Sequence, residues 1–521
     1  MKLSRVIQLI EFRSLKNFHE MEISGIECDS RRISPNILFA CISGYSEDGH
    51  KYAEDAVRLG AKALLVEKEL ALPETIAQIR VENCRIALSK LAHEFNGKPS
   101  EAMHITGITG TNGKSSCAWL LRAINNSIGF KTGLIGTIEY DTVKRTIEAS
   151  RTTPDGLALQ NYLREMRDAG ASHVAMEVTS IGLVLDRVSD VDFDAGCFIN
   201  LTRDHLDFHG DMERYREAKG LLFKMLKEDA VAILNADDPA SEYYKGITKA
   251  KIMTFGIRNK ADVMAEDLEI DISGIRFRLC LPGVCVKVAL PLVGEYGCTD
   301  ALAAAACSWA GTVQKKQAIK GVDGPDDLAR RIGWGLESCS GIPGRLQRVS
   351  DGQGRTIFVD YAHTGHALES VLGALRPLVK DGRLITVFGA GGNRDKGKRP
   401  LMARQVERFS DLFWVTSDNP RFEEPDAIIA DVMTGITDRG RCRIEPDREI
   451  AIRQAVFEME TGDVLVIAGK GHEKAQSIKG VNYEFDDVEV ASKCAAEAGK
   501  IDIHLLDGLQ VRQREARRRR A

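Results

Sequence analysis

Eight residues decide the fold of this chain: Thr109-Gly110-Thr111-Asn112-Gly113-Lys114-Ser115-Ser116. They follow the run Met103-His104-Ile105-Thr106, which predicts a strand, and lead into a helix-like pattern from Ser115 to Ile128. A glycine-rich turn between a strand and a helix is the context of a phosphate-binding loop, because backbone N–H groups and the helix N-terminus then face the phosphates. We therefore predict that Gly110, Thr111, Asn112, Gly113, Lys114, Ser115 and Ser116 bind nucleotide phosphates.

Two kinds of side chain in this loop have predicted roles. Lys114 would reach the β- and γ-phosphate oxygens, and the hydroxyl of Ser115 or Ser116 would hold Mg²⁺. The strict motif also asks for a glycine at the position of Ile108, so the general pattern is not matched. The alternative interpretation is a glycine-rich turn with a surface lysine, which the flanking strand and helix disfavour.

Apolar runs alternate with helical patterns on both sides of the loop. Before it, the runs 37–40 and 63–66 lie in a stretch from Ile26 to about Ala87 that predicts a small α/β unit, and 96–100 has the composition of a linker. After it, buried strands are expected at 173–178, 195–200 and 231–234, which predicts a parallel sheet covered on both faces. The alternating runs 275–281 and 284–290 flank Pro282-Gly283 and predict a late β-hairpin.

The pattern restarts after Pro343-Gly344-Arg345. Apolar runs at 356–359, 384–388, 412–415 and 464–468 predict a further doubly wound sheet. The expected class is α/β with three domains: a small α/β N-terminal domain (1–98), a central phosphate-loop ATPase domain with a parallel sheet (99–340) and a C-terminal Rossmann-like domain (341–500). A basic, disordered tail is expected at 501–521.

Composition excludes several classes of protein. The sequence has 521 residues, 44% hydrophobic and 28% charged, with 6% aromatic residues and a net charge of -4, which favours a soluble globular protein without a nucleic-acid partner. The 12 cysteines are scattered without a C-x-x-C pair, which predicts neither a zinc ribbon nor a disulfide framework and favours a reduced, cytoplasmic setting. No signal-peptide core or membrane-spanning stretch is expected, and the arginine-rich tail predicts only weak nonspecific attraction to polyanions.

The loop variant Gly110-Thr111-Asn112-Gly113-Lys114-Ser115 resembles the one in Mur ligases and folylpolyglutamate synthetases, and the resemblance to Mur ligases covers nearly the whole chain. Within that family the chain is most similar to the ligases that add the third peptide residue. The matching motifs are Asp29-Ser30-Arg31, Asp48-Gly49-His50, Glu177-Val178-Thr179-Ser180, the segment 200–207, Ala218-Lys219, Asn235-Ala236-Asp237-Asp238, Pro343-Gly344-Arg345, the segment 360–364, the segment 391–400, Asp418-Asn419-Pro420-Arg421 and Gly469-Lys470-Gly471-His472-Glu473.

The resemblance implies an ATP-dependent ligase that joins a carboxylate to an amine through an acyl-phosphate. Its substrates would be UDP-N-acetylmuramoyl-L-alanyl-D-glutamate and meso-diaminopimelate, and its cofactors would be ATP and Mg²⁺. The enzyme would act in peptidoglycan synthesis as a cytoplasmic monomer. Phosphoryl transfer between two anions depends on metal ions and cationic groups. The implied catalytic residues are Lys114, Lys219 and His205, and the implied metal ligands are Ser115, Glu177, His205 and Lys219, with Lys219 carbamylated by CO₂.

The remaining implied contacts fall into three groups. ATP would also meet Asn235, Arg345 and Asp360, with His363 at a junction that closes around the nucleotide. The UDP-precursor would meet Ser30, Thr152, Thr153, Thr179 and Arg187. Diaminopimelate would meet Arg394, Asp418, Asn419, Pro420, Arg421, Gly469 and Glu473. Arg421 carries the choice of amino acid, because a guanidinium can bind the distal carboxylate through two hydrogen bonds and lysine lacks that carboxylate.

Several positions depart from the family pattern, namely Ile181, Leu185, Gly297, Asp300 and Asn393. Because Lys114, Glu177, His205 and Lys219 are kept, we expect an active enzyme. The alternatives are a ligase that adds L-lysine or another residue, a folylpolyglutamate synthetase, and a weakly active protein that binds the precursor.

Overall fold

The computed structural model describes residues 1–44, 47–314, 321–349 and 355–498, and its α/β class is the expected one. The chain divides into two compact units, Met1–Asp267 with Arg278–Val288 and Thr299–Ser338, and Leu268–Phe277 with Ala289–Cys298 and Cys339–Ala521. Within the described ranges, no helix is long and apolar enough to cross a membrane. The predicted tail lies outside the described residues.

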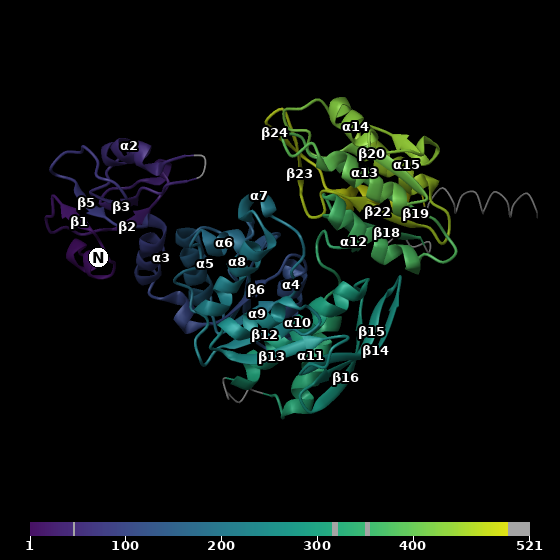
Figure 1. Cartoon of the computed structure of the whole chain (residues 1–521), viewed down its shortest axis with the longest axis horizontal. Coiled ribbons are helices and arrows are strands. Elements are labelled where there is room, and N and C mark those ends of the chain that lie inside the picture. The colour runs from purple at the N-terminus through teal and green to yellow at the C-terminus, as the bar shows by residue number, and fades with distance from the viewer. Residues whose placement is uncertain (45–46, 315–320, 350–354, 499–521) are drawn as a thin grey trace, which may run out of the picture. The chain divides into compact units, whose positions relative to one another are not determined.

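The N-terminal sheet of the first unit has the strand order β1-β5-β4-β3-β2, and only the edge strand β1 pairs antiparallel (Figure 1). Its strands are β1 (Ser14–Lys16), β2 (Gly25–Glu27), β3 (Ile37–Ala40), β4 (Ala63–Val66) and β5 (Ala77–Arg80). Its helical segments are α1 (Leu3–Gln8), η1 (Ser30–Arg32), η2 (Gly49–Tyr52), α2 (Ala53–Arg58) and α3 (Cys84–Phe95). All side chains of β3 and β4 are buried, as expected of inner parallel strands covered on both faces.

The central sheet has the order β16-β15-β14-β13-β12-β11-β6-β10-β7-β8-β9. Its strands are β6 (His104–Thr109), β7 (Thr132–Ile135), β8 (Glu139–Asp141), β9 (Thr146–Glu148), β10 (His173–Glu177), β11 (Ala195–Phe198), β12 (Val231–Asn235), β13 (Lys251–Gly256), β14 (Val263–Asp271), β15 (Gly274–Leu281) and β16 (Val284–Leu290). The helical segments near it in sequence are η3 (Pro99–Ala102), α4 (Lys114–Ile128), α5 (Gly156–Asp168), α6 (Ser180–Val184), α7 (Leu206–His209), α8 (Met212–Met225), α9 (Ala240–Ile247), α10 (Glu295–Gln314) and α11 (Pro325–Glu337).

Strand β6 occupies the middle of this sheet and delivers the chain to the phosphate loop. It pairs in parallel with β10 and β11, and all residues of the three strands are buried. The register sets Glu177 of β10 beside Ile108 of β6. Carboxyl ends of parallel strands meet on one edge of a sheet, so the sequences after β6, β10, β11 and β12 are gathered there.

The second unit contains a sheet of order β17-β18-β22-β19-β20-β21 and the hairpin β23-β24. The strands are β17 (Gln347–Val349), β18 (Thr356–Asp360), β19 (Leu384–Ala390), β20 (Leu412–Ser417), β21 (Cys442–Ile444), β22 (Val464–Ala468), β23 (Ala475–Ile478) and β24 (Val481–Glu484). The helical segments are α12 (Gly365–Leu375), η4 (Arg376–Leu378), α13 (Lys398–Phe409), α14 (Pro425–Met433), η5 (Arg439–Arg441) and α15 (Arg448–Glu458), with a last helical stretch at 487–498. Apart from the antiparallel edge strand β17, the pairs within the larger sheet are parallel.

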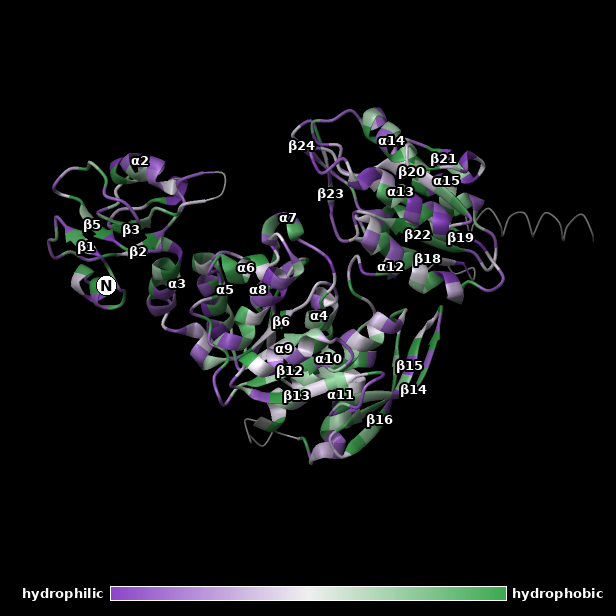
Figure 2. Cartoon of the chain, viewed as in Figure 1, coloured by the Kyte–Doolittle hydropathy of each residue, from purple (hydrophilic) through white to green (hydrophobic). Residues whose placement is uncertain are grey.

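Apolar cores lie on both faces of the larger sheet in the second unit. One contains Phe358, Phe388 and Phe413, and the other contains Trp414, Ile452 and Ile467. Figure 2 shows hydrophobic and hydrophilic bands on the same helices, as expected of helices that cover a sheet with one face. This double cover is the doubly wound arrangement that the sequence predicted.

The sequence located the inner strands correctly and missed most of the edges. The apolar runs 37–40, 63–66 and 464–468 match β3, β4 and β22. The N-terminal sheet begins at Ser14, earlier than expected. The predicted hairpin at 275–281 and 284–290 is confirmed as β15 and β16, which continue the central sheet beside β14. The expected linker is partly built into the fold, because Arg167 donates hydrogen bonds to the carbonyls of Asn96 and Gly97.

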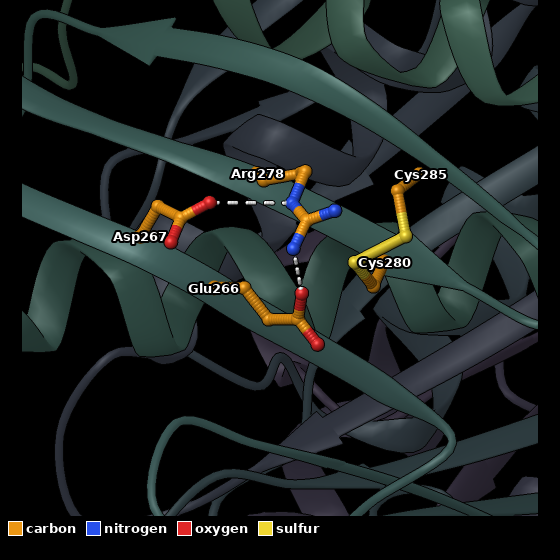
Figure 3. The surroundings of a disulfide bond; sticks show 5 residues. All are labelled: Glu266, Asp267, Arg278, Cys280 and Cys285. Atoms are coloured by element: carbon orange, nitrogen blue, oxygen red, sulfur yellow. Dashed lines mark hydrogen bonds and ion pairs between the residues drawn. A yellow bond between two sulfur atoms is a disulfide. The ribbon is translucent and has the colours of Figure 1, made fainter.

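The sequence predicted no disulfide framework, but the structure joins a cysteine pair that this prediction did not foresee. Cys280 of β15 and Cys285 of β16 are joined across the turn at Pro282-Gly283, with their Cα atoms 4.1 Å apart (Figure 3). Antiparallel strands connected by a two-residue turn bring such positions face to face, which sequence spacing alone does not reveal. Nearby, Arg278 forms ion pairs with Glu266 and Asp267.

A substitution at Gly335 of α11 tests how closely this helix packs against α4, the helix that follows the phosphate loop. A methyl group there would overlap the backbone of Ile124 in α4, and Ser127 of α4 also donates to the carbonyl of Arg331 in α11 at 2.7 Å. We expect Gly335→Ala to lower the free energy of unfolding by about 1–3 kcal/mol. Gly246→Ala is the matched control: that helical glycine has open space around its Cβ position, so the change should stabilise by roughly 0.5–1 kcal/mol. Urea unfolding of both variants measures the difference, and equal effects would contradict this account of α4 and α11.

Candidate active site

Lys114 begins α4 and folds back over the phosphate loop. Its Nζ donates to the carbonyls of Gly110 at 2.9 Å and Thr111 at 2.8 Å. The preceding residue, Gly113, has φ +85°, and a Cβ there would collide with the carboxylate of Asp300. Glycine is therefore needed at 113 both for backbone conformation and for space.

Asn200, which directly follows β11 and Ile199, holds the open side of the loop. Its Oδ1 accepts hydrogen bonds from the backbone N–H groups of Thr111 at 3.1 Å and Asn112 at 2.9 Å. Its Nδ2 returns a bond to the carbonyl of Asn112 at 3.3 Å. One amide side chain thus fixes the orientation of loop groups that are predicted to meet phosphate.

Lys219 of α8 is buried directly beneath the loop, with 1% of its surface exposed. Its Nζ donates to the carbonyl of Gly110 at 2.8 Å and lies 4.3 Å from the ring centre of Tyr215. Burial, together with the positive charge of Lys114, lowers the pKa of Lys219 well below its usual value. A neutral amine is a nucleophile, so this environment favours chemistry at Nζ that a surface lysine does not undergo.

Glu177 ends β10 and is 1% exposed. Its two carboxylate oxygens accept from the N–H of Thr137 at 2.8 Å and from the Thr137 hydroxyl at 3.0 Å. Gly136 is required beside it, because a side chain there would overlap the carboxylate. The carboxylate is thereby held at the edge of the sheet next to the phosphate loop.

Three of the predicted precursor contacts gather around Glu177. The hydroxyl of Thr152 lies 3.0 Å from that of Thr137, and the hydroxyl of Thr153 donates to the carbonyl of Glu177 at 3.0 Å. Thr179 lies 3.1 Å from Thr153 through the two hydroxyl oxygens. The structure therefore brings Thr152, Thr153 and Thr179 into one hydrogen-bonded cluster.

Arg187 and Ser30 differ in how they relate to this cluster. Arg187 joins it by donating to the carbonyl of Thr153 at 2.9 Å, and burial lowers its pKa. Ser30 lies in η1, whose cap is Asp29, and among the described residues no hydrogen bond or ion pair connects it to the threonines. Its predicted role stays a prediction.

The other predicted metal ligands are placed differently from Glu177. His205 has φ +51° before α7, is 48% exposed, and has Nε2 3.6 Å from Asp204 Oδ2. Ser115 is buried in the first turn of α4. In the part of the chain that the structure describes, no three histidine, cysteine, aspartate or glutamate side chains meet as the ligands of a metal ion do.

Asn235, a predicted ATP contact, ends β12. Its Nδ2 donates to the carbonyl of Ile199 at 2.8 Å and its Oδ1 accepts from the N–H of Asp237 at 2.9 Å. The amide therefore connects the ends of two neighbouring strands.

In the second unit, Asp360 closes β18. Its carboxylate accepts from the N–H groups of Leu346 at 2.7 Å and Ala362 at 2.8 Å, and burial raises its pKa although Arg345 opposes the shift. Arg345 stacks over Tyr361 at 5.2 Å. Burial lowers the pKa of the His363 ring. The backbone carbonyl of His363 accepts a hydrogen bond from Lys398 Nζ at 3.1 Å.

Asp418, Asn419, Pro420 and Arg421 follow β20 directly. Asp418 is 8% exposed, and its Oδ2 is buried with no hydrogen-bond partner among the described residues. Gly469, with φ +120°, leaves room for that oxygen, since a Cβ would lie 2.6 Å from it. A buried carboxylate oxygen without a donor is an acceptor available to a ligand cation.

Arg421 has φ +54° and is held at the same edge by its backbone. Its N–H donates to the carbonyl of Ser477 at 2.9 Å, and its Nη1 donates to the carbonyl of Gly392 at 2.9 Å. Within the described residues, Nε and Nη2 make no hydrogen bond to protein. Arg394, in the adjoining loop, is exposed.

Glu473 accepts hydrogen bonds from two side chains, Asn419 and Lys470, and Lys470 was not among the predicted site residues. Asn419 Nδ2 donates to Glu473 Oε2 at 2.8 Å, and the fully buried Lys470 donates to the same oxygen at 3.1 Å and to the carbonyl of Ala475 at 2.6 Å. The second unit thus assembles the predicted amino-acid contacts Asp418, Asn419, Arg421, Gly469 and Glu473 around two strand ends.

Three family models match successive parts of the chain. Residues 22–96 match the family described as Mur ligase family, catalytic domain, residues 108–308 match Mur ligase middle domain, and residues 344–471 match Mur ligase, glutamate ligase domain. A relative from Geobacillus kaustophilus (strain HTA426) is 42% identical over 485 residues, which are 92% of this chain and 96% of the relative. The chain belongs to the Mur ligase family.

That relative is named UDP-N-acetylmuramoyl-L-alanyl-D-glutamate--2,6-diaminopimelate ligase, and so is a relative from Clostridioides difficile (strain 630), 39% identical over 95% of this chain and 100% of its own. A solved structure with the same name is 32% identical, covers 91% of this chain and 95% of its own, and superposes with a TM-score of 0.64. A MurF ligase from Thermotoga maritima in complex with ADP, at 19% identity, 91% and 98% coverage and a TM-score of 0.61, shares the fold. The three-domain Mur ligase architecture is thereby confirmed.

Some residues of this Mur ligase escaped sequence reasoning because their roles are local. Asn200 and Lys470 both lie inside family motifs, yet only the structure shows which hydrogen bonds they make. Thr137 lies in none of these motifs. His209 is another such residue, with Nε2 2.9 Å from Ser180 Oγ and a pKa lowered by burial.

Two departures from the family pattern have local structural roles. Asp300 occupies the space under Gly113. Asn393 takes φ +52°, a conformation that asparagine tolerates well, and accepts from the N–H of Phe422 at 3.0 Å. For Ile181 and Leu185 the structure gives no comparable explanation, and Gly297 packs beside Ile275 and Leu292.

Asn200 gives a direct test of the loop. Asn200→Ala leaves the N–H groups of Thr111 and Asn112 without their acceptor and should weaken ATP binding about 10-fold, since an unmet hydrogen bond costs about 1–3 kcal/mol. Asn125→Ala is the control, because Asn125 accepts from Ser308 at 2.9 Å inside the same α4 but away from the loop. Calorimetric titration with ATP measures both, and unchanged affinity in Asn200→Ala would remove this residue from the nucleotide site.

Proposed function

We propose that this Mur ligase uses ATP to join meso-diaminopimelate to UDP-N-acetylmuramoyl-L-alanyl-D-glutamate in peptidoglycan synthesis. The observation that carries the proposal is the arrangement of Arg421, Asp418 and Glu473 at the ends of β20 and β22, which offers a cation and two carboxylates to one amino acid. The names of the relatives at about 40% identity support the same pair of substrates.

The reaction would proceed in two displacements. A carboxylate oxygen of the precursor attacks the γ-phosphorus of ATP, the bond to the β-phosphate bridging oxygen breaks, and ADP leaves an acyl-phosphate. The amine of diaminopimelate then attacks the acyl carbon, loses a proton and expels phosphate. Lys114 and the loop N–H groups are suited to the first step, because fixed positive charge stabilises the transferring phosphoryl group.

Mg²⁺ fits the residues around the loop. The buried carboxylate of Glu177 and the hydroxyl of Ser115 are oxygen ligands of the kind Mg²⁺ prefers, and the ion would neutralise phosphate charge during transfer. His205 would complete the set at the exposed rim.

Lys219 supports the proposal through a chemistry specific to a neutral amine. Its Nζ would attack CO₂, form an N–C bond and lose a proton, giving a carbamate whose oxygens are magnesium ligands. A lowered pKa favours the unprotonated form of Nζ, which is the form that reacts with CO₂. The conversion would also place an anion near the positive charge of Lys114, so that the two side chains would attract each other.

The choice between diaminopimelate and L-lysine would rest on Arg421. The free Nε and Nη2 edge matches a carboxylate in a two-bond geometry, and the buried Oδ2 of Asp418 and the Glu473 carboxylate match ammonium groups. L-Lysine has no distal carboxylate and would leave that edge unpaired.

Initial rates with the purified chain, ATP and the muramoyl dipeptide test the function. We expect phosphate release and product only when diaminopimelate is present, with L-lysine used at least 100-fold less well, a discrimination of the size that an unmet buried ion pair allows. Equal use of L-lysine would refute the specificity. Binding of ATP without turnover for any amino acid would favour the weakly active binding protein, and turnover of a folate would favour the folylpolyglutamate synthetase.

Arg421→Ala should lower kcat/KM for diaminopimelate by roughly 30-fold or more, because a charge-assisted pair lost from a substrate carboxylate costs about 2–5 kcal/mol. Arg404→Ala, on the exposed face of α13, is the matched control and should stay near wild type. Steady-state kinetics at saturating ATP separate the two; a wild-type value in Arg421→Ala would mean that another cation selects the amino acid.

Lys219→Ala should be nearly inactive and should regain part of its activity when a short-chain carboxylic acid is added, since an anion would replace the carbamate. An added amine serves as control and should not help. Rescue by the amine alone, or full activity without any addition, would rule out the carbamate.

A further inference from the structure

An ion pair lies fully buried behind the candidate amino-acid site. Arg448, the first residue of α15, and Asp487, the first residue of the helical stretch 487–498, both have 0% side-chain exposure. The guanidinium binds the carboxylate through two parallel bonds, from Nε to Oδ1 and from Nη2 to Oδ2, each 2.7 Å. Such a two-bond pair fixes the plane of both groups.

The same guanidinium also reaches the backbone of two strands. Its Nη1 donates to the carbonyl of Ser417 at 3.3 Å, and its Nη2 donates to the carbonyl of Ala468 at 3.0 Å. Ser417 is the last residue of β20 and Ala468 the last residue of β22, and these strands lie on either side of β19. One side chain therefore connects two strand ends that are not themselves paired.

The residues that follow these two carbonyls are Asp418 and Gly469. Both belong to the candidate amino-acid site, and Gly469 makes the space for the unpaired Oδ2 of Asp418. The distance between the strand ends thus determines how Asp418 lies against the loop that carries Lys470 and Glu473.

Asp487 also connects Arg448 to the hairpin β23–β24, because the hairpin ends three residues before Asp487. The hairpin is hydrogen-bonded to Arg421 on both sides: Arg421 N–H donates to Ser477, and Lys479 N–H donates to the carbonyl of Arg421 at 2.5 Å. Anchoring at Asp487 therefore restrains the segment that holds the Arg421 backbone.

A gain in folding stability does not explain why two charged residues are buried at this position. Burying two charges costs several kcal/mol of desolvation, and well-packed apolar residues of similar volume are often as stable or more so. What apolar residues lack is the ability to hold two carbonyls and a carboxylate at fixed positions. Function at this place requires that fixed geometry, because binding groups must be held within roughly 0.5 Å.

We propose that Arg448 and Asp487 are positioning residues that set the geometry of the amino-acid site by joining the ends of β20 and β22 to the segment after β24. The proposal rests on the proposed function for the identity of the ligand, diaminopimelate, and on the contacts above for the geometry. Both side chains are fully buried, so we expect them to act through the strand ends and not by contact with the ligand.

The test is the double variant Arg448→Met/Asp487→Leu, which removes both charges and keeps an apolar filling. We expect thermal stability close to wild type. The KM for diaminopimelate should rise about 10-fold or more, while kcat at saturation and the KM for ATP stay within about 3-fold. If the ion pair served stability alone, a double variant of wild-type stability would also keep every kinetic constant near wild type. Arg448→Lys, which keeps the charge without the fork, should fall between wild type and the double variant.

Arg383 and Asp463 provide the matched control. They form an ion pair at 2.6 Å at the opposite edge of the same sheet, just before β19 and β22, and Arg383 also donates to the carbonyl of Glu458 at 2.8 Å. Arg383→Met/Asp463→Leu should leave the KM for diaminopimelate within about 2-fold, because these residues lie at the amino ends of the strands.

Amide hydrogen exchange gives a readout that needs no activity. In the Arg448→Met/Asp487→Leu variant, peptides covering 418–421 and 469–473 should exchange faster than in wild type, and the control variant should not change them. If wild type fails to use diaminopimelate, the proposed function is wrong, and exchange in these peptides still decides whether the pair positions the strand ends. A folded double variant with wild-type KM and wild-type exchange would overturn the proposal.

Discussion

Parallel pairing imposes one constraint on which both candidate sites depend: neighbouring strands end on the same edge of a sheet. In the first unit, β6, β10 and β11 are followed by the phosphate loop, Val178-Thr179 and Asn200. In the second, β20 and β22 are followed by Asp418 and Gly469. Short polar segments far apart in sequence thereby meet without long connecting loops, and the buried inner strands give them a rigid base.

Buried charge recurs at these edges. Lys219, Lys470 and Arg448 have almost no exposed side-chain surface, and each donates to backbone carbonyls near a strand end. Desolvation would make an unpaired cation intolerable there, so each carbonyl or carboxylate partner is needed for the fold as well as for the site. Lys219 differs from the other two, because no carboxylate of the described residues forms an ion pair with it and burial lowers its pKa.

Sequence reasoning succeeded where periodicity and local motifs coincide. Inner strands such as β4 and β22 are continuous apolar runs between polar segments, and the phosphate loop lies between a strand and a helix, so both were readable from the chain. Edge strands such as β9 and β21 are three residues long and only partly buried, and they leave no periodic signal. The clusters around Glu177 and Glu473 include hydrogen bonds between residues far apart in sequence, such as Thr153 with Thr179, 26 positions apart, and Asn419 with Glu473, 54 positions apart, which no spacing rule encodes.

Asp487 follows Arg448 by 39 residues, so the ion pair between them forms late in the synthesis of the second unit. Ribosomes deliver a chain from its N-terminus at about 5–20 residues per second, and domains fold as units once their residues have emerged. Until the helical stretch 487–498 has been delivered, Arg448 lacks its counter-charge, and the ends of β20 and β22 lack the connection that passes through it. The strand and helix of the phosphate loop are complete by Ile128, whereas the candidate amino-acid site can mature only after Asp487 has emerged.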